Sequence, residues 1–265
     1  MSAEFETTVE IGRVPIAVRC ADLSFIEMLE QRYVNFLGAP AREGISLEVS
    51  IAPPSRITDE EDLEVAFDSG RWVMRRGDFL AEWDPVTRQG RVRQSANPYA
   101  IDSVLRIIHS LVLARSGGLL LHSASAIRGG RAFLFLGVSG AGKTTIARLA
   151  PPDATLLTDE ISYVRRLGGG FHAYGTPFAG ELGVAGENVV APIAAIYFLA
   201  KGPDNRVRPI PESLAARSLL RDVLFFADDA ELVEEVFRTA CEFVSSVPAY
   251  ELTFRPETEV WGLVA

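Results

Sequence analysis

The sequence predicts an α/β protein in two parts, and three observations lead to this fold class. Short strand-like segments separated by turn residues fill the first hundred positions. A helical segment opens at Asn97-Pro98, where a cap residue precedes a first-turn proline. After Leu119, apolar strands alternate with glycine loops and helices. We therefore expect a small α+β domain over residues 1–97 and a larger α/β domain over residues 98–265.

Length and composition exclude several classes of protein. The 265 residues are 48% hydrophobic and 23% charged, which is typical of a globular chain with room for two modest domains. No apolar run approaches the roughly 20 residues that cross a membrane, and the start of the chain has no secretory character. The net charge of −9 argues against nucleic acid as a partner. Cys20 and Cys241 show no paired spacing, so we expect a cytoplasmic protein without a zinc site.

The first domain is expected to contain two strands, a helix and a meander. Residues 15–18 and the strictly alternating residues 45–51 read as strands, and a helix over 24–37 is stopped by Gly38 and Pro40. A linker rich in proline and acidic residues follows over 53–62. The meander strands are predicted at 63–67, 71–75, 79–83 and 91–94. Trp72 and Trp83 are expected in its core or in a patch that faces a partner.

The second domain is expected to open with a helix from 98 to about 115, followed by a hairpin of residues 119–127 and 132–136. This hairpin leads directly into a glycine loop. Further strands are predicted at 155–158, 161–165, 171–174, 194–199, 206–210 and 249–254. Helices are predicted at 212–226 and 230–244.

The segment from Gly137 to Thr145, Gly-Val-Ser-Gly-Ala-Gly-Lys-Thr-Thr, has the pattern and the flanks of a phosphate-binding loop. Glycines let the backbone curl so that several N–H groups point at one anion, and the following helix adds the positive end of its dipole. Lys143 would reach the terminal phosphates and the Thr144 hydroxyl would ligate Mg²⁺. The alternative is a glycine-rich turn. The residues expected to bind nucleotide are Gly137, Ser139, Gly140, Ala141, Gly142, Lys143, Thr144 and Thr145.

Asp159 and Glu160 end the strand that follows the loop, sixteen and seventeen residues after Lys143. This is a usual place for a carboxylate that holds Mg²⁺, and a second acid beside it can accept a proton from an attacking hydroxyl. The alternative is a solvated acidic turn. His122 lies among small residues on the strand before the loop, where it is either functional or a satisfied core histidine. His109 and His172 are expected to be structural.

His122, the loop lysine twenty-one residues later, and the acid pair together resemble the catalytic domain of bacterial HPr kinase/phosphatase. The resemblance covers residues 119–252, about half of the chain. It implies a phosphoenolpyruvate-carboxykinase-like P-loop kinase core with ATP and Mg²⁺ as cofactors. Carried over, His122 would position or tune the acid pair, Asp159 would share in metal binding, and Glu160 would accept the proton of a substrate serine.

The sequence departs from this family in two places. The second acid is Glu160 where the family has aspartate, so its carboxylate reaches one methylene further. The family's Glu-Ile-Arg-Gly-Leu-Gly segment is absent, and the nearest region is 175–181. There, Glu181 is either a further metal ligand or an exposed loop acid. The chain resembles more closely the HPr-kinase-like proteins of peptide-modification clusters, some of which phosphorylate a serine of a precursor peptide.

The expected function is therefore an ATP- and Mg²⁺-dependent kinase that acts on a hydroxyl, with a protein or peptide serine as the leading acceptor. A small hydroxyl metabolite is the second acceptor class, and a nucleotide-dependent binding module with slow hydrolysis is the non-enzymatic alternative. Whether the chain forms a homo-oligomer stays open. Cations for the transferring phosphoryl group are expected among exposed residues, each of which is otherwise a solvated charge: Lys201, Arg206, Arg208, Arg217 and Arg221.

Overall fold

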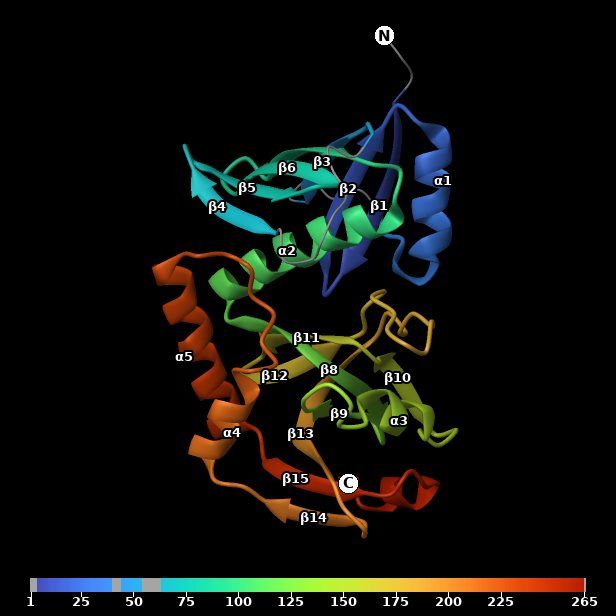
Figure 1. The fold of residues 1–265 in the computed structure, drawn as a ribbon, viewed down its shortest axis with the longest axis vertical. Coiled ribbons are helices and arrows are strands. Elements are labelled where there is room, and N and C mark those ends of the chain that lie inside the picture. Colours follow the sequence, from blue (N-terminus) through green and yellow to red (C-terminus); the bar gives the residue numbers. More distant parts are fainter. Residues whose placement is uncertain (1–3, 40–43, 54–62, 265) are drawn as a thin grey trace. The chain divides into compact units, whose positions relative to one another are not determined.

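The computed structural model describes residues 4–39, 44–53 and 63–264 (Figure 1). It divides into two compact units, one of Met1–Leu111 with Phe225–Ala230 and one of Val112–Leu224 with Glu231–Ala265. This division falls inside the helix that begins at Pro98, later in the chain than the boundary that the sequence predicts. Most of the predicted acidic linker, residues 54–62, lies outside the described residues.

The first unit is a seven-stranded sheet with the order β1-β2-β3-β7-β6-β5-β4. Its elements are β1 (Phe5–Ile11), β2 (Val14–Cys20), α1 (Leu23–Arg32), β3 (Ile45–Ile51), β4 (Glu64–Asp68), β5 (Arg71–Arg76), β6 (Phe79–Asp84) and β7 (Gln89–Gln94). The antiparallel pairing of β4 to β7 confirms the predicted meander. The helix is shorter than predicted, because it ends at Arg32 and a 3₁₀ turn follows at Val34–Phe36.

Alternating burial explains the core of this unit. On β3, Ile45, Leu47 and Val49 are buried while Glu48 is exposed, as a strand with one covered face requires. Trp72 and Trp83 lie directly opposite each other on β5 and β6 and are 1% and 5% exposed. They therefore belong to the core rather than to a partner-facing patch.

The second unit carries the phosphate-loop segment. Its strands are β8 (Gly118–Arg128), β9 (Arg131–Leu136), β10 (Ala154–Thr158), β11 (Ile161–Leu167), β12 (Gly170–Tyr174), β13 (Val190–Lys201), β14 (Arg206–Pro209) and β15 (Ala249–Phe254). Its helices are α3 (Lys143–Arg148), α4 (Glu212–Leu219) and α5 (Ala230–Ser246), and α2 (Pro98–Ser116) runs through the boundary between the units. The predicted helix over 212–226 is wrong beyond Leu219, because residues 222–224 leave the helix and pair with β8.

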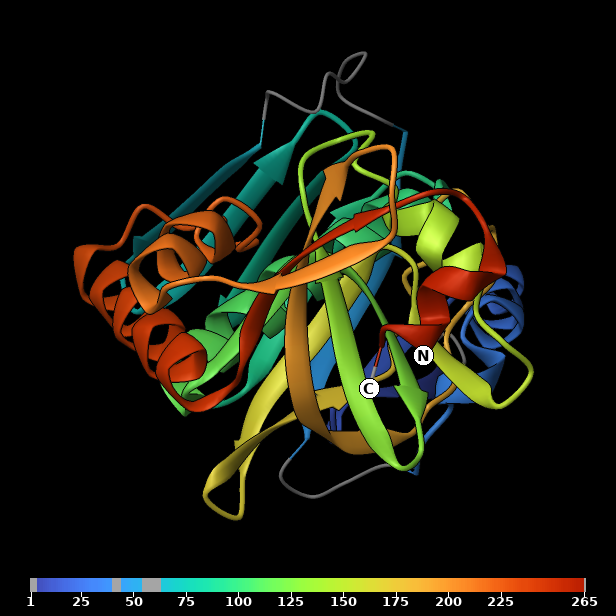
Figure 2. The ribbon, with the colours of Figure 1, turned by 90° about the horizontal axis from the view of Figure 1, so that it is seen from below.

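The strands of this unit form a sheet with the order β10-β8-β11-β12-β13-β15-β14, while β9 pairs with both β8 and β13. These pairings join β8, β11, β12, β13 and β9 into a closed ring. Figure 2 shows β8, β9 and β13 side by side. β13 runs parallel to β9 and β15, and the other pairings are antiparallel. This mixed α/β architecture confirms the fold class, whereas a carboxykinase-like core stays a prediction.

Helix α3 rests on small side chains of β8. Ala124 and Ala126 are fully buried in a cluster with Ile146 of the helix. Trp261, in the same cluster, donates a hydrogen bond from Nε1 to the Ile146 carbonyl over 3.0 Å. The helix that follows the loop is thus fixed by close packing and by one directional bond. Within the described part of the chain, no helix combines the length and the apolar character needed to cross a membrane.

Candidate active site

Strand β8 organises the site because both of its edges change partners near His122. On one edge β11 begins with Ile161 opposite His122, whereas β10 ends with Thr158 opposite Ser125. The Asp159-Glu160 turn connects these two strands. On the other edge β9 ends with Leu136 opposite Ser123, and the glycine loop starts at the next residue. The histidine, the acid pair and the loop, far apart in the sequence, therefore meet at one level of the sheet.

The backbone of the loop takes conformations that favour glycine. Gly140 and Gly142 have φ angles of 73° and 112°, in the left-handed region. Gly142 also caps α3, and a Cβ on it would lie 2.8 Å from Cζ of Phe254. The first helical hydrogen bond runs from Ile146 N–H to the Gly142 carbonyl. The N–H groups of the first helical turn precede it, and this is the arrangement that an anion at a helix start needs.

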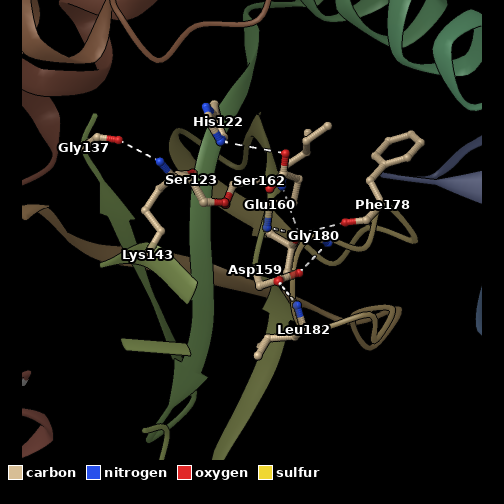
Figure 3. A network of polar contacts seen from close by, with 12 residues as sticks. His122, Ser123, Gly137, Lys143, Asp159, Glu160, Ser162, Phe178, Gly180 and Leu182 are labelled. Atoms are coloured by element: carbon tan, nitrogen blue, oxygen red, sulfur yellow. Dashed lines mark hydrogen bonds and ion pairs between the residues drawn. The ribbon is translucent and has the colours of Figure 1, made fainter. Parts of the chain in front are cut away.

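Lys143 is 8% exposed, and its ammonium donates a hydrogen bond to the Gly137 carbonyl over 2.7 Å (Figure 3). The lysine thus reaches back over its own loop. Thr144 and Thr145 are half-buried in the first turn of α3, while Ser139 and Gly140 are exposed at the tip of the loop. Of the loop residues named from the sequence, Ala141 is buried in the cluster beneath α3.

Asp159 is held by the backbone of the loop that follows β12. Its side chain is buried, and its two carboxylate oxygens accept hydrogen bonds from Gly180 N–H at 2.8 Å and from Leu182 N–H at 2.9 Å. The turn itself is fixed by Thr158, whose Oγ1 accepts from the N–H groups of Glu160 and Ile161. Asp159 is therefore a rigid buried carboxylate, not the solvated acid of the alternative interpretation.

Gly180 brings the two acids together. A Cβ on this residue would lie 2.8 Å from Oδ2 of Asp159 and 2.8 Å from Oε2 of Glu160. Both carboxylates therefore approach the position that a Cβ of residue 180 would occupy. Oδ2 of Asp159 and Oε2 of Glu160 can lie no further apart than twice 2.8 Å. A larger residue at position 180 would therefore force these carboxylate oxygens to shift.

Glu160 faces His122. The distance between Oε1 of Glu160 and Nε2 of His122 is 3.8 Å, and the side chains are 35% and 38% exposed (Figure 3). An imidazole and a carboxylate at this distance attract each other when the histidine is protonated. Both groups remain open to a ligand from solvent.

Glu181 is exposed in the loop whose neighbouring N–H groups hold Asp159. Among residues 4–39, 44–53 and 63–264, no cluster of three or more histidine, cysteine or acidic side chains forms a metal site. Glu181 therefore lies between the two residues that bind Asp159, but within the described part of the chain it joins no metal-ligand cluster.

The predicted cations all lie on the surface: Lys201, Arg206, Arg208, Arg217 and Arg221. Arg208 forms an ion pair with Glu251 on the neighbouring strand β15. Arg221 directly precedes the buried Asp222, and its charge acts to lower the pKa of that carboxyl group.

Asp222 is a site residue that the sequence analysis missed. It is 8% exposed, and burial raises the pKa of its carboxyl group, while the charges of Lys143 and His122 act in the opposite direction. Its backbone carbonyl accepts a hydrogen bond from His122 N–H over 2.7 Å, at the position of β8 next to the end of β9. The run of four apolar residues after it, Val223–Phe226, fits an amphipathic helix poorly, and this signal could have shown that the helix ends earlier.

Comparisons with known proteins found one matching family model and a distant likeness to a solved structure. A family model described as SynChlorMet cassette protein ScmC matches residues 94–264, which include every residue of the site. A solved structure of the Hpr(Ser) kinase/phosphatase from Coxiella burnetii aligns over 55% of this chain and 85% of that chain, with 11% sequence identity and a TM-score of 0.32. None of the curated proteins compared shows significant sequence similarity to the chain.

Proposed function

The chain belongs to the ScmC family, and we propose that it is an ATP- and Mg²⁺-dependent kinase that transfers the γ-phosphoryl group to a hydroxyl. One observation carries this proposal. The curled glycine loop with its buried lysine and a pair of converging carboxylates meet at the same level of β8. The loop and the lysine suit a triphosphate. One carboxylate suits a divalent cation, and the other can accept a proton.

The loop would cradle the phosphates with its backbone N–H groups, and Lys143 would turn from the Gly137 carbonyl toward the terminal phosphate oxygens. The residues fit Mg²⁺ by their chemistry, because the Thr144 hydroxyl and the Asp159 carboxylate supply the hard oxygen ligands that this ion prefers. When bound, Mg²⁺ would neutralise charge on the phosphate oxygens. Asp159 is already fixed by two N–H groups, so its carboxylate would need little reorganisation to coordinate Mg²⁺.

Glu160 is the proposed proton acceptor, since it is more open than Asp159 and lies beside His122. As the acceptor oxygen attacks the γ-phosphorus, a new P–O bond forms and the bond to the β–γ bridging oxygen breaks, which releases ADP. The hydroxyl proton passes to the Glu160 carboxylate. His122 would steady that carboxylate across the 3.8 Å gap.

A peptide or protein serine is the proposed acceptor, and a surface of the first unit supports it. A hollow of about 1070 Å³ lies on the polar face of the seven-stranded sheet, with Leu80, Arg93 and the ion pair of Arg91 with Glu48 in its lining. Its size and mixed charges suit a peptide segment better than a small metabolite. The family is one of cassette proteins, which also supports a role beside the products of neighbouring genes.

The proposal is tested by incubating the full chain with Mg-ATP, with and without a serine-containing peptide encoded beside its gene. We expect ADP to form at an appreciable rate only with the peptide, and the peptide to gain the mass of one phosphoryl group. Slow ADP formation at the same rate with and without the peptide would instead identify a nucleotide-dependent binding module. Transfer to small hydroxyl compounds in preference to the peptide would assign a metabolite kinase.

A further inference from the structure

The polar face of the first unit's sheet carries a row of charges that neutralise one another. The row crosses five strands, and its members lie opposite one another in the strand register: Glu6, Arg19, Glu48, Arg91 and Glu82. Arg19 forms an ion pair with Glu6, and Arg91 forms one with Glu48 over 3.3 Å. Because each of these arginines has an acid on both sides, the row keeps little charge for a partner.

The row beside it, one step closer to the start of α1, forms the floor of the hollow. Two small residues lie in its middle, Ala21 directly after β2 and Ser50 on β3. Arg93 lies opposite Ser50, and Leu80 lies opposite Arg93. Glu4, one residue before β1, lies at the other end. The small side chains in the middle leave space between the larger ones, which is why this face is hollowed here.

Arg93 differs from the arginines of the neighbouring row, because no acid lies opposite it on β3 or β6. The two acids placed diagonally, Glu48 and Glu82, form ion pairs with Arg91 and Arg71 instead. Within the described part of the chain, Arg93 itself forms no ion pair, and Leu80 beside it is 39% exposed. A free guanidinium next to an exposed apolar side chain suits a carboxylate that is followed by an apolar group.

The other end of the hollow carries the opposite charge. Glu4 is exposed and forms no ion pair with the residues that the structure describes. The nearby Asp22 carboxylate is already engaged, since it caps α1 by accepting hydrogen bonds from the N–H groups of Ser24 and Phe25. Three strand spacings separate β1 from β7, which is roughly 14 Å. A fully extended chain covers this distance in about four residues.

We propose that the hollow binds an extended segment of the acceptor peptide that runs across the strands. A carboxylate of the segment pairs with Arg93, an apolar side chain next to it contacts Leu80, and a basic side chain about four residues away pairs with Glu4. The proposal rests on the proposed function in taking a peptide as the acceptor. A small metabolite could not reach both ends of the hollow, whereas an extended segment does.

The first experiment measures how the full chain binds the fluorescently labelled peptide encoded beside its gene, without nucleotide, by fluorescence polarisation. We expect Arg93→Ala to weaken binding roughly threefold or more, as the loss of an ion pair predicts. Arg93→Glu should weaken it roughly 10-fold or more, because the carboxylate is then repelled. Arg75→Ala is the matched control, since this exposed arginine on the same face lies outside the lining and faces Glu64.

Wild-type binding by Arg93→Ala, or no binding of the peptide by the wild type, overturns the proposal. A second copy of the chain is the competing occupant of this face. Analytical ultracentrifugation tests it, and a dimer of the wild type that Arg93→Glu dissociates would also overturn the proposal.

The second experiment identifies the peptide residue that meets Arg93. Each acidic residue of the peptide is replaced by alanine and measured against the wild type and Arg93→Ala. We expect one acidic position to weaken binding to the wild type roughly threefold or more, with little further effect in Arg93→Ala. One basic position about four residues away should show the same coupling with Glu4→Ala. A merely structural role of Arg93 would weaken all peptides alike and would overturn the proposal.

These readouts separate failure of this inference from failure of the proposed function. If Arg93 is coupled to a peptide acid but the peptide gains no phosphoryl group from Mg-ATP, the binding site stands and the kinase assignment fails. If the peptide is phosphorylated without this coupling, the function stands and the inference is wrong. Circular dichroism checks that each variant is folded, and Arg93→Lys, which keeps the charge, should recover most of the binding that Arg93→Ala loses.

Discussion

The Asp159 carboxylate is tied to the Gly180 backbone by a hydrogen bond of 2.8 Å from the Gly180 N–H to Oδ1. The same glycine lies against Glu160, since a Cβ there would come within 2.8 Å of Oε2. The loop after β12 therefore determines how the acid pair is presented. A substitution at Gly180 therefore tests the placement of the acid pair as directly as a substitution of either acid.

Gly180→Ala should lower kcat by roughly 10-fold or more, because the added methyl group displaces both carboxylates from their present positions. Steady-state kinetics with the peptide acceptor measure the effect. Gly170→Ala is the matched control, since a Cβ at that glycine meets nothing within 4 Å. A Gly180→Ala variant with the kcat of the wild type would show that the placement of the acids does not limit the reaction.

Asp159→Asn should lower the free energy of unfolding by about 1–3 kcal/mol, because the amide offers one acceptor where the carboxylate serves two buried N–H groups. Urea unfolding followed by tryptophan fluorescence measures the change. We expect this variant to lose Mg²⁺-dependent activity as well. Unchanged stability would contradict the role of Asp159 as the anchor of residues 180–182.

Glu160→Gln should lower kcat far more than it changes the affinity for Mg-ATP, because an amide cannot accept the hydroxyl proton. Its stability should change little, since the side chain is about one third exposed. Measurement of kcat and of nucleotide Kd separates the two effects. Weaker Mg-ATP binding with unchanged turnover would assign Glu160 to the metal and leave Asp159 as the proton acceptor.

Lys143→Ala should reduce transfer by at least roughly 10²-fold, because it removes the positive charge closest to the loop. The fold should survive, and thermal unfolding checks this. Lys201→Ala is the internal control, as the other lysine of the chain lies exposed at the end of β13. Equal activities of the two variants would refute the assignment of the phosphate loop.

The stability of the protein should depend on pH through Asp222. Burial raises the pKa of this carboxyl group above its ordinary value of 3.8. Its contribution to stability is therefore present below pH 3.8 and is lost as the pH rises through the pKa in the folded protein. Asp222→Asn should gain stability over the wild type toward neutral pH and lose this advantage in acid. Urea unfolding across this range measures the difference, and a difference independent of pH would contradict the prediction.

Local patterns were sufficient for much of the fold. Alternation predicted the strand over residues 45–51 with the bounds that the structure has, and the hairpin before Gly137 followed from two apolar runs around a glycine turn. The start of a helix after the glycine loop was equally readable, because Gly142 takes the left-handed conformation and α3 begins at Lys143. That the loop binds phosphate stays a prediction. The alternation of side chains along a strand and the conformational freedom of glycine depend on residues that are neighbours in the chain. Both can therefore be read from the sequence.

Tertiary structure decided what surrounds that loop. Asp222 lies next to the start of the loop on the edge of β8 only because residues 222–224 leave the expected helix and pair with β8. Likewise, Gly180 meets the acid pair only because a loop folds back along β10. Both contacts join segments that are distant in the sequence, and they depend on which strand edges are free. The sequence alone thus determined the loop and its flanking strands, whereas sheet pairing determined which acids meet it.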